Sequence, residues 1–218
     1  MSAGAGPLVA VYADESCLGN GREGDNPGGA GGLIEVVAAG DGRTVRRDFW
    51  VSEPATTNNR MALRSAIEAL RALGAKGRRC RVVFTSDSQY LVTGMREWVH
   101  GWAARGWTRR TGPIENLALW QEACAAARLH DVEWRWVRGH DGHAQNEYAN
   151  HLATRAAADQ TSSGGLVDSG FEAWIAAQKK GGVRAPDDFP AASAFRPARP
   201  APEPPAAALP HVAAVRPS

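Results

Sequence analysis

The sequence of 218 residues contains few cysteines and no paired arrangement of them. Cys17, Cys80 and Cys124 are odd in number and lack CxxC spacing, which argues against a disulfide framework or a zinc site and fits a reducing compartment. Residues 1–7 lack the basic start and apolar run of a signal peptide. No apolar run reaches the length of a membrane span. We therefore expect a cytoplasmic protein without a membrane partner.

An excess of charge of one sign is also absent from the chain as a whole. Its 25 Lys and Arg residues nearly balance its 23 Asp and Glu residues, so the net charge of +2 says little about partners. Hydrophobic residues make up 44%, which is enough for a core, and the length allows one domain with an appendage. Positive charge gathers locally, because basic residues are interleaved with tryptophans between Arg96 and Arg110.

Apolar runs and hydrophobic periodicity divide most of the chain into three strands, a helix, a strand, helices, a strand and a last helix. The expected strands cover residues 8–13, 32–37, 44–51, 80–86 and 131–137. The expected helices include the apolar pattern at residues 63–73, which residues 57–59 can cap, and cover residues 88–97, 113–128 and 144–159. This order of elements predicts an α/β fold in which helices pack on the faces of a mixed sheet.

The ends of the chain differ in composition from its centre. We predict a flexible N-terminus at residues 1–6, a folded domain at 7–160, and an appended tail at 161–218. The tail is rich in Pro and Ala, so we expect it to be largely disordered or PPII-like, with one short helix at 171–178. The glycine-rich stretch 19–32 is predicted to be a long turn, because it lacks the setting and the Gly-Lys-Ser/Thr ending of a phosphate-binding loop.

Two acidic residues stand at the ends of two predicted strands. Asp14 follows the strand at 8–13, and Asp87 follows the strand at 80–86. Open α/β sheets place their ligands at the carboxyl ends of such strands. Carboxylate oxygens are the ligands that Mg²⁺ prefers, so the sequence predicts a shared acidic metal site.

Two groups of residues have two interpretations each. Thr57, Asn58 and Asn59 precede a predicted helix, so they can cap it, and their exposed polar groups can also meet phosphates or base edges. Trp98 and Trp102 lie one helical turn apart, which is typical of core residues. The arginines around them suit a grip on a nucleic-acid backbone equally well.

Five segments carry motifs in a fixed order: YADESCLGN at Tyr12–Asn20, TTNNRMAL at Thr56–Leu63, SDSQY at Ser86–Tyr90, WVHGW with RGW at Trp98–Trp107, and WVRGHDGH with NE at Trp136–Glu147. Together they closely resemble type 1 ribonuclease H of the bacterial kind. The resemblance implies a five-stranded mixed sheet with helices on both faces. It also implies cleavage of the RNA strand of RNA–DNA hybrids with Mg²⁺ or Mn²⁺, and we expect a monomer.

The resemblance implies a site of four carboxylates that holds two divalent ions. Asp14 and Asp87 match the aspartates after the first and fourth strands. The glutamate of the first helix is replaced by Ala62, and the aspartate of the last helix by Asn150. The amide oxygen of Asn150 can still bind a metal, whereas Ala62 offers no ligand.

Glu15 is the residue that can compensate for Ala62, because it stands where the family typically has glycine. Consecutive residues of a regular strand face opposite sides, which favours a surface glutamate instead. That alternation can relax at the end of a strand, so both interpretations stay open. Glu68 is a poor substitute, because it lies six residues beyond Ala62 and points elsewhere around the helix.

The resemblance also implies roles for residues outside the carboxylate cluster. His140 matches a loop histidine that assists proton transfer and product release. Other positions match residues that contact the RNA minor groove, a DNA phosphate or the DNA strand. These positions are Asn20, Thr57, Asn58, Asn59, Gln89, Trp98, Trp102 and Arg105.

The sequence thus predicts a metal-dependent endoribonuclease that acts on RNA–DNA hybrids. The alternative is a hybrid-binding module that is catalytically weak or inactive. Ala62 favours this alternative, whereas the retention of Asp14, Asp87 and His140 favours the enzyme.

Overall fold

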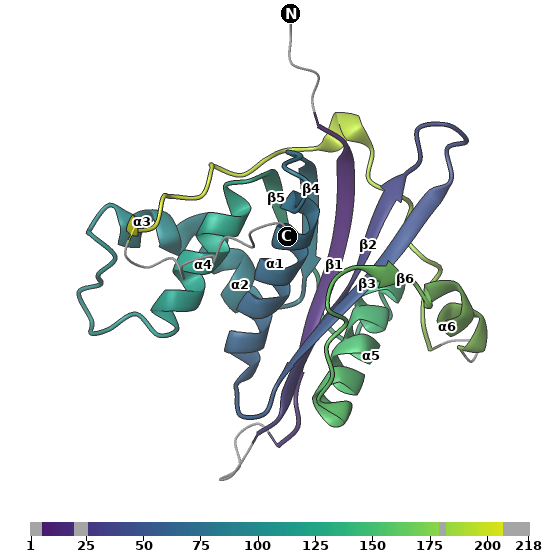
Figure 1. Ribbon diagram of the computed structural model, residues 1–218, viewed down its shortest axis with the longest axis horizontal. Helices are drawn as coiled ribbons and strands as arrows, with labels where there is room; N and C mark the ends of the chain where they lie inside the picture. Colours follow the sequence, from purple (N-terminus) through teal and green to yellow (C-terminus); the bar gives the residue numbers. More distant parts are fainter. Residues whose placement is uncertain (1–5, 20–25, 179–181, 207–218) are drawn as a thin grey trace, which may run out of the picture.

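A computed structural model describes residues 6–19, 26–178 and 182–206 (Figure 1). Its centre is a sheet of six strands in the order β5-β4-β1-β2-β3-β6. The strands are β1 (Leu8–Cys17), β2 (Gly28–Val37), β3 (Thr44–Glu53), β4 (Arg81–Ser86), β5 (Asp131–Trp136) and β6 (Val167–Asp168). β4 runs parallel to β1 and to β5, and the other pairs are antiparallel, so the sheet is mixed.

The predicted α/β class is confirmed, but the sheet has one strand more than the five expected. The additional strand, β6, consists of Val167 and Asp168, which pair with Asp48 and Arg47 of β3. Two residues carry no hydrophobic period, so β6 could be found only from its position beside β3.

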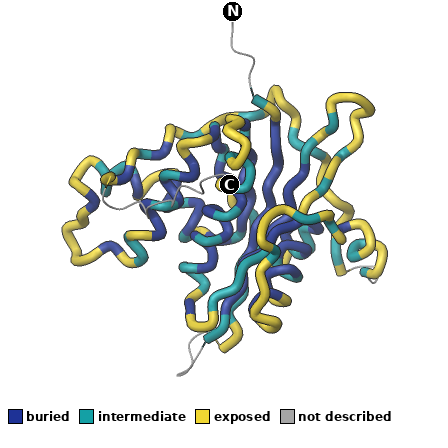
Figure 2. The backbone as a smooth tube through the Cα atoms, in the orientation of Figure 1, coloured by how far each residue is buried: buried dark blue, intermediate teal, exposed yellow. Residues whose placement is uncertain are grey.

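Helices cover both faces of the sheet (Figure 1). They are α1 (Asn58–Gly74), α2 (Gln89–Thr93), α3 (Val99–Ala103), α4 (Leu117–Ala127), α5 (Ala144–Asp159) and α6 (Phe171–Ala177). A π-helical turn, Gly94–Trp98, joins α2 to α3. One hydrophobic cluster packs α1 and α4 against one face, and a second packs α5 and α6 against the other. Figure 2 shows the burial concentrated in the central strands and in the helix faces turned toward them.

Strand β1 runs through the centre of the molecule and contributes to both cores. Val9, Val11 and Ala13 belong to the cluster of α1 and α4, whereas Ala10 and Tyr12 belong to the cluster of α5. This alternation follows from the two-residue period of a strand. Its continuation places the next two residues of β1 on opposite faces of the sheet.

The glycine-rich stretch is not one long turn, because Gly28–Gly32 forms the first half of β2. The glycines of β2 allow the backbone of α5 to approach closely. A Cβ atom at Gly29 would lie 2.2 Å from the Ala153 carbonyl oxygen, and one at Gly31 would lie 2.7 Å from the Ala153 nitrogen. Glycine has low strand propensity, so the sequence pattern predicted a turn for this stretch. A glycine that lets another backbone approach a strand cannot be recognised from the local sequence alone.

Residues 182–206 of the tail contain little regular secondary structure, but parts of them contact the domain. The backbone N–H of Ala198 donates a hydrogen bond of 2.8 Å to the Val132 carbonyl, and Ala201 is buried. This part of the tail therefore contacts the start of β5, the edge strand, and continues toward α3 (Figure 1). Pro/Ala composition does not reveal an order that depends on hydrogen bonds to another element. Residues 1–5 and 207–218 lie outside the described ranges.

The segment between the domain and this part of the tail contains α6 (Phe171–Ala177), which covers nearly the range of the expected short helix. Phe171 is fully buried, and its ring lies edge-on to Tyr148 of α5. Within the described ranges, no helix combines the length and apolarity that crossing a membrane requires.

Candidate active site

Three carboxylates meet at the carboxyl end of β1 and β4. Asp14, Glu15 and Asp87 each place one oxygen within 4.8 Å of the oxygens of the other two. The expected proximity of Asp14 and Asp87 is therefore present. Glu15 lies in the same cluster and not on the surface.

The different lengths of two strands explain how consecutive residues reach one site. β4 ends at Ser86, which pairs with Ala13, whereas β1 continues to Cys17. Asp14 and Glu15 thus lie beyond the end of β4, where β1 is paired with β2 on one side only and its other side is open. Their side chains converge there on Asp87, the residue that follows β4. Because Glu15 follows Ala13 by two residues, it comes from the side of α1, the helix that carries Ala62.

Burial disfavours the charged forms of all three acids, and repulsion within the cluster adds to this effect for Asp14 and Glu15. Burial, and then the Asp87 charge, raise the pKa of Asp14 to about 8, although a hydrogen bond from the Glu15 backbone opposes the shift. Burial and the charges of Asp14 and Asp87 raise the pKa of Glu15 well above its ordinary value. Burial also raises the pKa of Asp87, and nearby His140 acts in the opposite direction.

The oxygen atoms of this cluster fit a divalent cation. Glu15 Oε2 and Asn146 Oδ1 are buried and have no hydrogen-bond partner among the described residues. Asn146 Nδ2 donates a hydrogen bond of 3.2 Å to Asp14 Oδ2, which holds the amide beside the acids. A bound cation would satisfy these oxygens and offset the repulsion, and hard cations prefer such ligands.

The loop between β5 and α5 closes one side of the cluster. A Cβ atom at Gly139 would lie only 2.2 Å from Asp87 Oδ2, so the loop backbone contacts this carboxylate directly. His140 has a left-handed backbone with φ of 53°, and its side chain is 78% exposed. Its Nδ1 atom lies 4.0 Å from Oε2 of Glu147. His140 is thus free to meet a substrate beside the acids.

Two positions that depart from the family pattern lie on α1 and α5. Ala62 is fully buried in the apolar cluster that also contains Ala13. Asn150 is half-buried and lies one helical turn after Asn146, on the same side of α5. Sequence reasoning missed Gly139, Asn146 and Glu147 as site residues, although the Gly-His-Asp-Gly-His and Asn-Glu motifs contain them.

Four of the residues predicted to contact the substrate lie at the starts of α1 and α2. Thr57 caps α1, since its hydroxyl accepts a hydrogen bond of 3.4 Å from the Arg60 backbone. Asn58 Oδ1 has no partner among the described residues, Asn59 is half-buried, and Gln89 is exposed at the start of α2. Asn20 lies outside the described residues.

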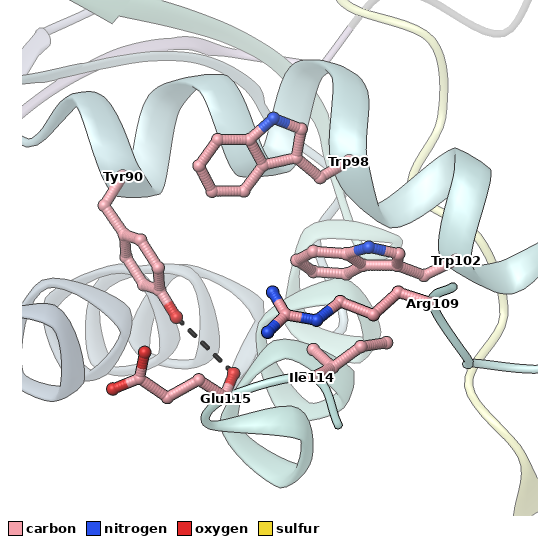
Figure 3. A pocket seen from close by; sticks show the side chains of 6 residues that line it. All are labelled: Tyr90, Trp98, Trp102, Arg109, Ile114 and Glu115. Carbon is pink, nitrogen blue, oxygen red and sulfur yellow. Dashed lines mark hydrogen bonds between the residues drawn. The ribbon is translucent and has the colours of Figure 1, made fainter. Parts of the chain in front are cut away.

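An aromatic pocket of about 280 Å³ lies beside α3 and the π-helical turn Gly94–Trp98 (Figure 3). Trp98 and Trp102 stand next to each other there, with ring centroids 6.0 Å apart. Trp102 packs against the core, as the interpretation of the pair as core residues expects. Trp98 is 37% exposed, so its ring is accessible to a nucleic-acid strand, as the other interpretation expects. Arg105 is exposed nearby in sequence, after α3.

The pocket is completed by Tyr90, which ends the SDSQY motif, and by Arg109, Ile114 and Glu115, which lie outside the five motif segments. Arg109 extends beside Trp102, and Tyr90 faces Glu115, whose carbonyl accepts a hydrogen bond of 3.5 Å from the tyrosine hydroxyl (Figure 3). Aromatic faces with one guanidinium suit a sugar–phosphate strand. The expected helix at 113–128 begins later, since α4 starts at Leu117, and residues 109–115 form no regular element. Their contribution to the pocket therefore depends on the tertiary structure.

The raised pKa of Asp14 has a measurable consequence for stability. Between its ordinary value of 3.8 and its folded value of about 8, the folded state binds more protons than the unfolded state. In the presence of a chelator, stability is therefore expected to fall as the pH rises through this range. Mg²⁺ should raise the melting temperature more at pH 8 than at pH 5, because it competes with the protons. Thermal melts with EDTA and with Mg²⁺ measure this; equal shifts at both pH values would contradict it.

Comparison with known proteins identifies close relatives. The sequence model of the family described as RNase H matches residues 7–158. The ribonuclease H of Herminiimonas arsenicoxydans is 44% identical over 148 residues, which cover 67% of this chain and 92% of that protein. Ribonuclease HI of Shewanella oneidensis is 42% identical over 167 residues, covering 76% and 96% of the two chains. The crystal structure of LC9-RNase H1, described as a type 1 RNase H with the type 2 active-site motif, has a TM-score of 0.86, 65% identity and 98% coverage of both chains.

Proposed function

This chain belongs to the RNase H family and cleaves the RNA strand of RNA–DNA hybrids, and we propose that Asp14, Glu15 and Asp87 are the carboxylates that hold its divalent ions. The proposal rests on the convergence of their oxygens within 4.8 Å. Glu15 thereby takes the role that the family usually gives to a glutamate at the position of Ala62. The description of LC9-RNase H1 supports this, because that relative combines the type 1 protein with an active-site motif of another type.

We propose Mg²⁺ or Mn²⁺ as the cofactor. When bound, the ions activate the attacking water and stabilise the leaving oxygen. Asp14 and Asp87 would hold them from the ends of β1 and β4, and Glu15 would hold them from the side of α1. Asn146 fixes the orientation of Asp14 through its hydrogen bond of 3.2 Å. Asn150, one turn further along α5, supplies an amide oxygen where the family has an aspartate.

His140 is proposed to move protons during hydrolysis and product release. It is exposed next to Asp87, and the Glu147 carboxylate lies 4.0 Å from its Nδ1 atom. An exposed imidazole between acids and solvent can accept a proton from a substrate group and release it to water.

The hybrid is proposed to bind across the sheet end, the start of α1 and the aromatic pocket. Polar groups near the carboxylates contact the RNA strand and the adjacent backbone, whereas aromatic and basic groups near α3 contact the DNA strand. The residues concerned are Asn20, Thr57, Asn58, Asn59, Gln89, Trp98, Trp102, Arg105 and Arg109. Monomeric state and cytoplasmic location stay predictions.

A labelled RNA–DNA duplex tests the enzymatic function against the hybrid-binding alternative. We expect endonucleolytic cleavage of the RNA strand in Mg²⁺ and in Mn²⁺, and no cleavage in EDTA. An RNA–RNA duplex and a DNA–DNA duplex of the same sequence serve as controls. A mobility shift of the hybrid without cleavage in either metal would establish the binding module instead.

A further inference from the structure

We propose that Arg184 and Asp187, in the tail, are positioning residues for hydrolysis, because they fasten the His140 loop and the first turn of α5. This inference rests on the proposed role of His140. The tail is distant in sequence from the loop and from the acids, yet its residues 184–187 contact both the loop and the helix that carries Asn146.

Arg184 holds the loop immediately after His140. Its backbone N–H donates a hydrogen bond of 2.8 Å to the Gly142 carbonyl. Its Nε atom donates to the Asp141 carbonyl at 2.9 Å, and a terminal guanidinium nitrogen lies 2.6 Å from Asp141 Oδ2. Arg184 therefore fixes both the backbone and the side chain of the residue that follows the histidine. The planar, forked guanidinium suits this set of acceptors.

Asp187 holds the start of α5 through His143. The Nδ1 atom of His143 accepts a hydrogen bond of 3.3 Å from the Asn146 backbone and so caps the helix. The proton of the neutral ring must then be on Nε2, which lies 3.0 Å from Asp187 Oδ2. Asp187 thus stabilises the tautomer that caps the helix. Its backbone also pairs with the Gln145 side chain in both directions, at 2.9 and 3.1 Å.

The loop requires such external contacts. His140 and Gly142 both have left-handed backbones, with φ of 53° and 76°. A non-glycine residue in this conformation persists only where its surroundings favour it. The His140 side chain is mostly exposed and has few contacts of its own. The tail supplies contacts that reduce the number of loop conformations.

The ion pair of Arg184 with Asp141 is more than half exposed on both sides. Exposed pairs contribute little to global stability. Loss of the pair should therefore change the position of His140 much more than the melting temperature. This separation distinguishes a positioning role from a structural one.

A double-mutant cycle between Arg184 and His140 tests the proposal in the full-length protein. Arg184→Ala is expected to lower kcat on the hybrid by about 10-fold and to leave KM nearly unchanged. This loss is at the lower end of what is seen when a group that orients an active-site ligand is removed. In the His140→Ala background, the same substitution should have no further effect on kcat. Arg184→Lys should recover only part of the loss, and Asp187→Ala should resemble Arg184→Ala.

Glu203→Ala is the matched control. Glu203 lies in the distal part of the tail, away from the loop, and forms an ion pair of 3.4 Å with Arg128 at the end of α4. Its substitution should leave kcat unchanged. An unchanged kcat in Arg184→Ala, or an equal loss in both backgrounds, would overturn the positioning role while leaving the proposed role of His140 intact. If His140→Ala itself keeps full activity, the proposed role of the histidine fails, and the inference fails with it.

Discussion

Replacement of Glu15 by Gln is expected to lower the rate of hybrid cleavage by about 100-fold or more, the scale on which loss of one stabilising group in an active site lowers kcat. Glutamine keeps the size of the side chain and one oxygen but removes the negative charge. Ala62 offers no ligand, so no other residue of the cluster can take over this charge. Cleavage of a labelled hybrid at saturating Mg²⁺ measures the loss.

The same substitution is expected to stabilise the metal-free protein at pH 8. Burial and the charges of Asp14 and Asp87 raise the pKa of Glu15, so its ionised form opposes folding above the ordinary value of 4.5. Glutamine removes that unfavourable charge. The melting temperature in EDTA should therefore rise, whereas the increase caused by Mg²⁺ should shrink. Loss of activity together with higher stability would show that the glutamate is retained for function.

Glu68→Gln provides the control for Glu15. Glu68 is a half-buried carboxylate of α1 and is the other glutamate that could compensate for Ala62. Its substitution is expected to leave cleavage unchanged. If Glu15→Gln retains full activity while Glu68→Gln loses it, the assignment of Glu15 is wrong.

Replacement of Gly139 by Ala is expected to lower cleavage by roughly 100-fold with little change in stability. The added methyl group would lie 2.2 Å from Asp87 Oδ2, so either the carboxylate or the His140 loop must move. A displacement of about 1 Å in an active site is enough for a loss of this size. Because the loop lies at the surface, it can relax, which limits the cost to the fold.

Gly40→Ala is the matched control for Gly139→Ala. A Cβ atom at Gly40 meets no atom within 4 Å, so this substitution tests only the effect of adding a methyl group. Steady-state kinetics and thermal melts of the two variants should differ in kcat and agree in melting temperature. Normal kcat in Gly139→Ala would mean that contact between the loop and Asp87 does not constrain the site.

The order of elements and the family motifs were accessible from the sequence because they depend on local patterns. A continuous apolar run predicted β1, the two-residue period predicted β5, and the helical period predicted α1 and α5. Asp14 and Asp87 could be placed together because parallel strands end at the same edge of a sheet. The glycines of β2 defeated the same reasoning, because their function is to admit the backbone of a distant helix.

The sequence by itself determined the family, the two strand-end aspartates and the absence of a carboxylate at Ala62. Only the tertiary structure decided that Glu15 lies in the acidic cluster, that Gly139 contacts Asp87, and that Arg184 and Asp187 hold the active-site loop. The physical reason is that a side chain's class is encoded locally, whereas its partners depend on where neighbouring strands end and how closely loops approach. β1 extends past the end of β4, and this difference in length brings two acids from opposite faces into one site.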